Sequence, residues 1–145
     1  MNIAVSNLNK KYGINERFAG KIARDILKII NKEDAVLEII FLSNDAIRPI
    51  NKRYKGRDRA TDVLSFDLDS CGQLLISSDM AMRNSRIYNT PFEKELALYV
   101  IHGILHLFGY DDDTPKARTR MSKKQDSILE ILCAKASLSK VLTRR

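Results

Sequence analysis

YVIHGILHLFGYDDD, at residues 99–113, is the stretch that decides the fold of this 145-residue chain. It contains both histidines of the sequence, His102 and His106, within a run of apolar residues. Positions i and i+4 lie on one face of an α-helix, roughly 5 to 6 Å apart, so two imidazoles at this spacing can bind one ion. The stretch therefore predicts a central, buried helix that carries a metal site.

The residues after the second histidine can supply a third ligand. Gly109 is typical of a helix end, where the chain reverses, and Asp111 or Asp112 would then offer a carboxylate. The alternative is a structural role for both histidines, each with its own buried hydrogen-bond partner. An unsatisfied buried polar group costs about 1 to 3 kcal/mol, and one shared cation satisfies both rings, so the pattern favours the metal.

Three protein ligands with an open fourth position are typical of a catalytic zinc site, which makes hydrolysis the expected reaction class. Metallopeptidases with two helical histidines carry a glutamate directly after the first one, as the base. Here that position is Gly103, which argues against peptide hydrolysis by this route. A phosphodiester substrate instead requires nearby positive charge, which the basic segment 52–59, with Lys55 and Arg57, would supply.

Charge and composition point to a polyanionic partner and a reducing compartment. Residues 114–145 hold nine basic and two acidic side chains and so carry the whole net charge of +7, a distribution that suits nucleic acid as well as a solvated helix face. Cys71 and Cys133 lack metal-binding or disulfide spacing, and the longest apolar run, residues 96–108, is too short to span a membrane. We therefore expect a cytoplasmic protein that is neither exported nor membrane-embedded.

Hydrophobic periodicity predicts a single α+β domain over residues 1–145, with several helices against a mixed sheet of about four strands. Strands are expected at residues 3–8, 35–42, 62–68 and 73–77, the last two joined as a hairpin. Helices are expected at residues 15–30, 45–54, 78–87 and 91–108, followed by a last helix from Pro115, and residues 52–59 are expected to form a loop. The predicted helix caps are Asn44 or Asp45, Thr90 and Thr114.

Two blocks of the sequence resemble a known family. Residues 102–111 match His-Gly-x-Leu-His-Leu-x-Gly-Tyr-Asp, a pattern of the bacterial YbeY family. Residues 51–66 resemble another pattern of that family, Asn-x-x-Tyr-Arg-Gly-x-Asp-x-Pro-Thr-Asp-Val-Leu-Ser-Phe, with differences at two positions. The similarity covers about residues 35–132. It implies a single-strand-specific, metal-dependent endoribonuclease that acts in rRNA maturation, at the 3′ end of 16S rRNA, and in quality control of the small ribosomal subunit.

The resemblance also implies roles for individual residues. His102, His106 and Asp112 would hold one divalent ion per chain, with zinc expected, while Lys55 or Arg57 would stabilise the transition state as bound water or an RNA 2′-hydroxyl attacks phosphorus. Asp111, if not a ligand, would orient one of the histidines.

The chain departs from the family pattern at four positions. Asp112 stands where the family has its third histidine, Lys55 replaces an arginine, Ala60 replaces a proline, and Gln73 stands near a usual aspartate. Two alternatives remain open at this point. One is a metallopeptidase-like or other small-substrate hydrolase, and the other is a non-catalytic ribosome-assembly factor with a structural metal.

Overall fold

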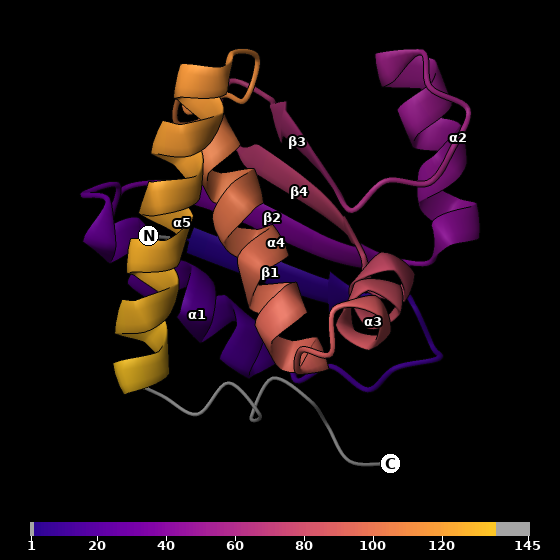
Figure 1. Ribbon diagram of the computed structural model, residues 1–145, viewed down its shortest axis with the longest axis horizontal. Helices are drawn as coiled ribbons and strands as arrows, with labels where there is room; N and C mark the ends of the chain where they lie inside the picture. Colours follow the sequence, from indigo (N-terminus) through magenta and orange to yellow (C-terminus); the bar gives the residue numbers. More distant parts are fainter. Residues whose placement is uncertain (1, 136–145) are drawn as a thin grey trace.

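The computed structural model describes residues 2–135 and shows an α+β fold with a four-stranded sheet (Figure 1). Its elements, in chain order, are β1 (Asn2–Asn7), α1 (Glu16–Ile29), β2 (Val36–Leu42), α2 (Asn44–Lys55), β3 (Val63–Asp67), β4 (Gly72–Ser77), α3 (Ser78–Ile87), α4 (Phe92–Leu107) and α5 (Pro115–Lys135). The predicted fold class is confirmed. Part of the basic end, namely Lys140, Arg144 and Arg145, lies outside the described residues.

The sheet is mixed, as predicted, with strand order β1-β2-β4-β3. Strands β1, β2 and β4 run parallel, and β3 pairs antiparallel with β4 through a tight hairpin in which the Leu68 N–H donates to the Cys71 carbonyl at 2.8 Å. Strand β3 therefore forms an edge of the sheet. Because successive side chains of a strand point to opposite faces, β3 presents one set of residues to each side.

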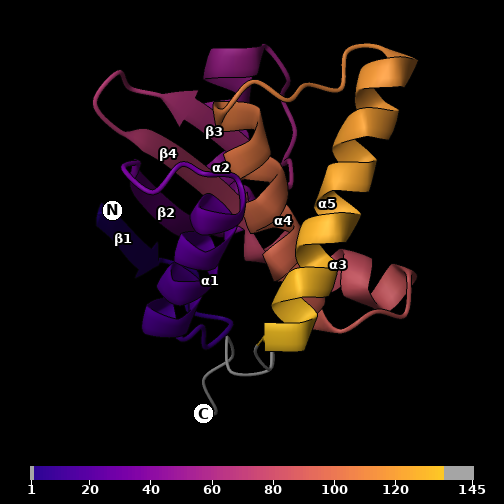
Figure 2. The same ribbon diagram turned by 90° about the vertical axis from the view of Figure 1, so that its left-hand side faces the viewer.

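Helices α1 and α4 cover one face of the sheet, and α5 packs on these two helices from the outside (Figure 2). Their buried residues form the main core, with α4 at its centre, and Ile101, Ile104 and Leu105 of that helix are fully buried. Burial of such side chains contributes about 1.5 to 3 kcal/mol each. None of the helices in the described part of the chain is long and apolar enough to cross a membrane.

Helix α2 packs on the opposite face of the sheet, where Ile47 joins Leu42, Leu64 and Leu75 in a second, smaller apolar cluster. The helix begins one residue earlier than expected, because Ser43 rather than Asn44 or Asp45 is its N-cap, accepting the Ala46 N–H at 3.2 Å. It ends at Lys55, one residue beyond the predicted end, whereas the loop expected from residue 52 was placed too early. Residues 52–55 are helical, and the loop begins at Gly56, whose φ of 69° is favourable for glycine.

Of the two caps predicted for the last two helices, the one for α5 is confirmed and the one for α4 is wrong. Thr114 caps α5 as expected and accepts the Ala117 N–H at 3.0 Å. Thr90 does not cap α4, because the first helical carbonyl is that of Pro91 and the Thr90 hydroxyl donates to the carboxylate of Glu95 at 2.7 Å. A hydrogen bond between side chains thus replaces the predicted bond between side chain and backbone.

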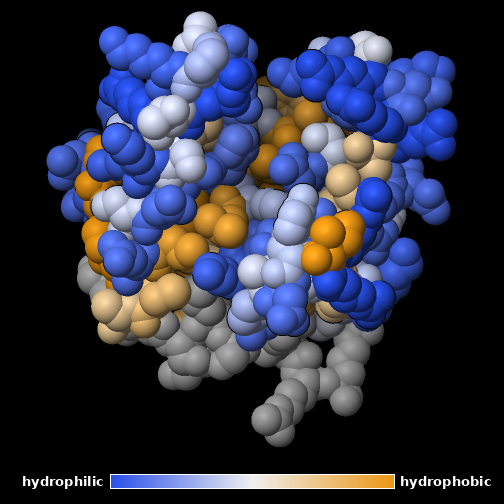
Figure 3. Space-filling model, viewed as in Figure 1, coloured by the Kyte–Doolittle hydropathy of each residue, from blue (hydrophilic) through white to orange (hydrophobic). Residues whose placement is uncertain are grey.

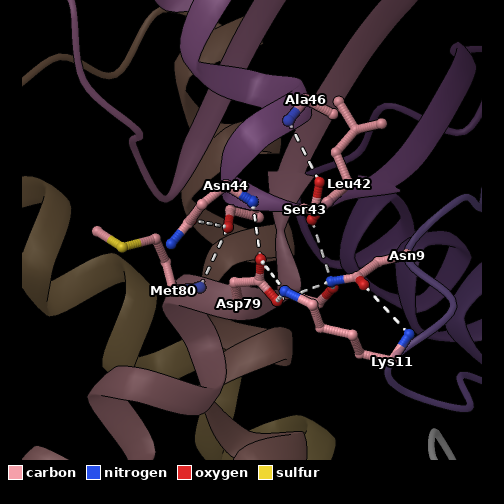
Figure 4. Close-up of polar contacts among 10 residues, drawn as sticks. Asn9, Lys11, Leu42, Ser43, Asn44, Ala46, Asp79 and Met80 are labelled. Atoms are coloured by element: carbon pink, nitrogen blue, oxygen red, sulfur yellow. Dashed lines mark hydrogen bonds and ion pairs between the residues drawn. The ribbon is translucent and has the colours of Figure 1, made fainter.

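The amino ends of α2 and α3 meet at the carboxylate of Asp79 (Figure 4). It accepts the Asn44 N–H at 2.8 Å, the Asn9 amide at 3.0 Å and the Lys11 ammonium at 3.2 Å. Burial raises the pKa of Asp79, but these hydrogen bonds outweigh it and hold the pKa below its usual value. A negative charge here is favourable because helix amino ends are electropositive.

Candidate metal centre

His102 and His106 lie one turn apart on α4, and their ring centroids are 4.7 Å apart. One nitrogen of each ring and one carboxylate oxygen of Asp112 all lie within 4.8 Å of one another. The structure thus brings together the three residues that the sequence suggested as ligands. Two neutral nitrogens and one anionic oxygen, open on one side, form a donor set that fits a divalent transition ion such as zinc.

The turn after α4 places the carboxylate. Gly109 has a φ of 96°, its N–H donates to the His106 carbonyl at 3.3 Å, and the Tyr110 N–H donates to the Leu105 carbonyl at 3.0 Å. This pair of bonds is the Schellman motif, which ends a helix and reverses the chain. Arg118, on α5, donates to the backbone carbonyl of Asp112 at 3.1 Å and so ties the turn to the next helix.

Gln125, on α5, is the partner of His102 that the sequence did not point to. Its amide oxygen lies 2.6 Å from Nδ1 of His102. An amide oxygen only accepts, so Nδ1 must carry the proton, and the lone pair of His102 is left on Nε2. Asp111 is the residue predicted to orient a histidine if it is not itself a ligand, and its carboxylate accepts a hydrogen bond from the Asp113 N–H at 3.3 Å.

The surroundings of His106 keep its imidazole neutral. Burial lowers its pKa, and so do the charges of His102 and Lys55, while Asp112 and Asp111 act in the opposite direction. The net result is a pKa below the usual value, so the lone pair is available near neutral pH. A metal ligand needs this state, because protonation competes with the ion.

The three donors lie in a cleft of 730 Å³ between α4, β3 and the end of α2. In Figure 3, which has the view of Figure 1, the surface is hollowed between the hydrophilic side chains of α5 at the upper left and those of α2 at the upper right. Lys55 and Arg57 both line the cleft, as do the carboxylates of Asp62 and Asp67. No described carboxylate lies within ion-pair distance of Lys55 or Arg57. Both residues expected to act on the substrate therefore share the cleft with the ligands.

Gly103 shows why no base follows the first histidine. A Cβ at this position would lie 2.8 Å from Cδ2 of Leu74 and 3.1 Å from Cγ2 of Val63. The backbone is further fixed by the hydroxyl of Ser65, which donates to the Gly103 carbonyl at 3.0 Å. A glutamate side chain would have to displace the side chains of Leu74 and Val63, so the metallopeptidase arrangement does not fit this helix.

Asn51 positions the basic loop. It is buried near the end of α2, and its side-chain amide donates to the Arg59 carbonyl at 2.9 Å. The loop that carries Arg57 is thereby held against the helix that carries Lys55. In the sequence, Asn51 stood out through its place in the family pattern, whereas Gln125 gave no such signal.

The fold and this donor set define an α+β protein with a candidate catalytic metal centre on one central helix. The sequence pattern of the family described as Endoribonuclease YbeY matches residues 4–133. The chain belongs to the YbeY family.

Individual relatives and a solved structure agree with this assignment. Endoribonuclease YbeY of Desulforamulus reducens is 35% identical over 150 residues, covering 91% of this chain and 97% of that protein. Endoribonuclease YbeY of Thermotoga maritima is 36% identical over 124 residues, covering 81% of this chain and 83% of that protein. A solution structure of a Thermotoga maritima protein, 34% identical, has a TM-score of 0.65 and covers 88% of this chain and 87% of its own.

Proposed function

We propose that this chain is a metal-dependent endoribonuclease that cleaves single-stranded RNA. The observation that carries the proposal is the convergence of His102, His106 and Asp112 in a cleft lined by Lys55 and Arg57. Membership of a family described as endoribonucleases supports the same activity. By the same resemblance, the substrate is rRNA at the 3′ end of 16S, the partner is the small ribosomal subunit and the location is the cytoplasm.

The ion is proposed to be zinc, one per chain, held by His102, His106 and Asp112. When bound, such an ion supplies Lewis acidity toward a phosphoryl oxygen and makes a water molecule more acidic. The protein's own part is to keep the imidazole of His106 neutral and to fix the tautomer of His102 through Gln125. These features favour metal binding near neutral pH.

Lys55 and Arg57 are proposed as the catalytic cations. A phosphodiester gains negative charge in the transition state, and fixed cations in a partly enclosed cleft stabilise that charge. Arginine can hold two phosphate oxygens at once, whereas lysine acts as a point charge. We therefore assign Arg57 to phosphate orientation and Lys55, whose charge acts on His106, to the region nearest the ion.

The test uses purified protein of measured metal content, incubated with single-stranded and duplex RNA, with and without chelator. We expect cleavage of the single strand only, lost with chelator and in His102→Ala, and reduced in Arg57→Ala with its metal content unchanged. The inactive ligand variant, purified in the same way, controls for contaminating nuclease.

Two results would redirect the proposal. Full zinc content in Asp112→Ala would remove Asp112 from the ligand set. Normal rRNA processing in cells that carry a metal-free variant would instead favour an assembly factor with no catalytic role.

A further inference from the structure

The end of α2 and the edge strand β3 form a wall between two cavities. On α2, Asn51 and Lys55 face the metal cleft, whereas Ile50 and Tyr54, also spaced by four residues, face a second groove. On β3 and the residue after it, Asp67 lines the metal cleft, and Phe66 and Leu68 line the groove. The helical and strand periods thus give each cavity its own set of side chains.

The second groove is apolar and open. It has a volume of 560 Å³ and lies on the sheet face opposite α4, beside the smaller apolar cluster. Tyr54 is 58% exposed at its rim, and Leu8 and Leu68 are similarly exposed. Large apolar side chains that gather at one concave place on a surface mark a binding site more often than scattered ones do.

The aromatic side chains of the groove are arranged for stacking. The rings of Tyr54 and Phe66 meet edge to face, with centroids 5.3 Å apart at 69°. The guanidinium of Arg53 lies 5.5 Å from the centroid of the Tyr54 ring, and no described carboxylate pairs with it. Phe66 thus supports a tyrosine that stays accessible, and a cation lies beside it.

The charge around the groove identifies the kind of occupant. Arg53 at the groove and Lys55 and Arg57 in the cleft form a basic band across the shared wall, which attracts a polyanion. A polyanion that also needs an aromatic, apolar surface is a single nucleic-acid strand, whose unpaired bases stack on such rings. A peptide would meet the same apolar surface but would not require the basic band.

We propose that this groove binds a base of single-stranded RNA next to the phosphodiester held in the metal cleft, with Tyr54 as the stacking residue. The proposal rests on the proposed function and adds a reason for strand selectivity. A base in a duplex is already stacked and paired, so it cannot lie on Tyr54 while the backbone crosses the wall.

The experiment measures binding of the metal-loaded protein by fluorescence anisotropy. One ligand is a labelled single-stranded 2′-O-methyl oligoribonucleotide, and the other is an abasic strand of the same length and charge. We expect Tyr54→Ala to weaken binding of the first by about 5- to 150-fold and to leave binding of the second unchanged. Tyr54→Phe should behave as wild type, because the ring is retained.

Tyr88→Ala is the matched control, because Tyr88 is 68% exposed at the end of α3, away from both cavities. It should bind both strands as wild type does, and thermal unfolding should show that every variant is folded. The inference would be overturned if Tyr54→Ala weakened binding of both strands equally or of neither strand. It would also be overturned if the wild-type protein bound both strands with equal affinity. Either result would remove the reason to prefer RNA over a peptide as the occupant of this groove. RNA cleavage by the same wild-type preparation tests the proposed function separately.

Discussion

Asp79→Asn should be the most informative change to the scaffold, because one carboxylate joins the amino ends of two helices and the β1–α1 loop. Its side chain is 12% exposed and accepts hydrogen bonds from Asn44, Asn9 and Lys11. Hydrogen bonds to a charged group contribute about 1.5 to 3 kcal/mol. Asparagine keeps one acceptor oxygen but loses the charge, so we expect a loss of about 2 kcal/mol in the free energy of unfolding at pH 7.

The effect should depend on pH in a defined direction. The pKa of Asp79 in the folded state is lowered, since hydrogen bonds to the carboxylate outweigh burial. Its contribution is therefore complete above the unfolded pKa, about 3.9, and is lost as the pH falls through the folded value. The difference between wild type and Asp79→Asn should stay constant from pH 7 to about pH 5 and then shrink.

Urea unfolding followed by circular dichroism measures this difference at each pH at which both proteins still fold. Asp58→Asn is the control, because Asp58 also has a lowered pKa, from its hydrogen bond and charge interaction with Arg48, but both partners are largely exposed. It should change stability much less. Equal stability of wild type and Asp79→Asn at pH 7, or a difference that persists unchanged in acid, would refute the role assigned to this carboxylate.

Three further changes test the site. Gly103→Ala should lower the melting temperature in thermal unfolding, because the gain of about 1 kcal/mol in helix propensity is outweighed by a cost of about 1 to 3 kcal/mol for a methyl group against Leu74. A raised melting temperature would show that α4 and the sheet separate easily. Gln125→Leu should lower zinc affinity by about 10- to 100-fold in calorimetry, because His102 loses the acceptor that fixes its tautomer, and unchanged affinity would remove Gln125 from this role. Asp112→His, which restores the family's residue, should retain zinc binding whereas Asp112→Ala weakens it, and loss of binding in both would mean that only a carboxylate fits.

Local patterns in the sequence were enough to predict most of the fold. The histidine-bearing helix, the hairpin at Leu68 to Cys71 and the Thr114 cap depend on residues close together in the chain. The errors fell where a near neighbour competed for the same role. Ser43 capped α2 in place of Asn44, and Thr90 bonded to Glu95 instead of the backbone.

The sequence by itself determined that two imidazoles share a helix face and that Gly109 turns the chain back toward them, because helical spacing and a left-handed turn act within one or two turns. Only the tertiary structure decided that Gln125 holds His102 and that α2 and β3 separate two cavities. These contacts join residues that are far apart in the chain and meet because of how the helices pack on the sheet. Short sequence patterns do not predict that packing.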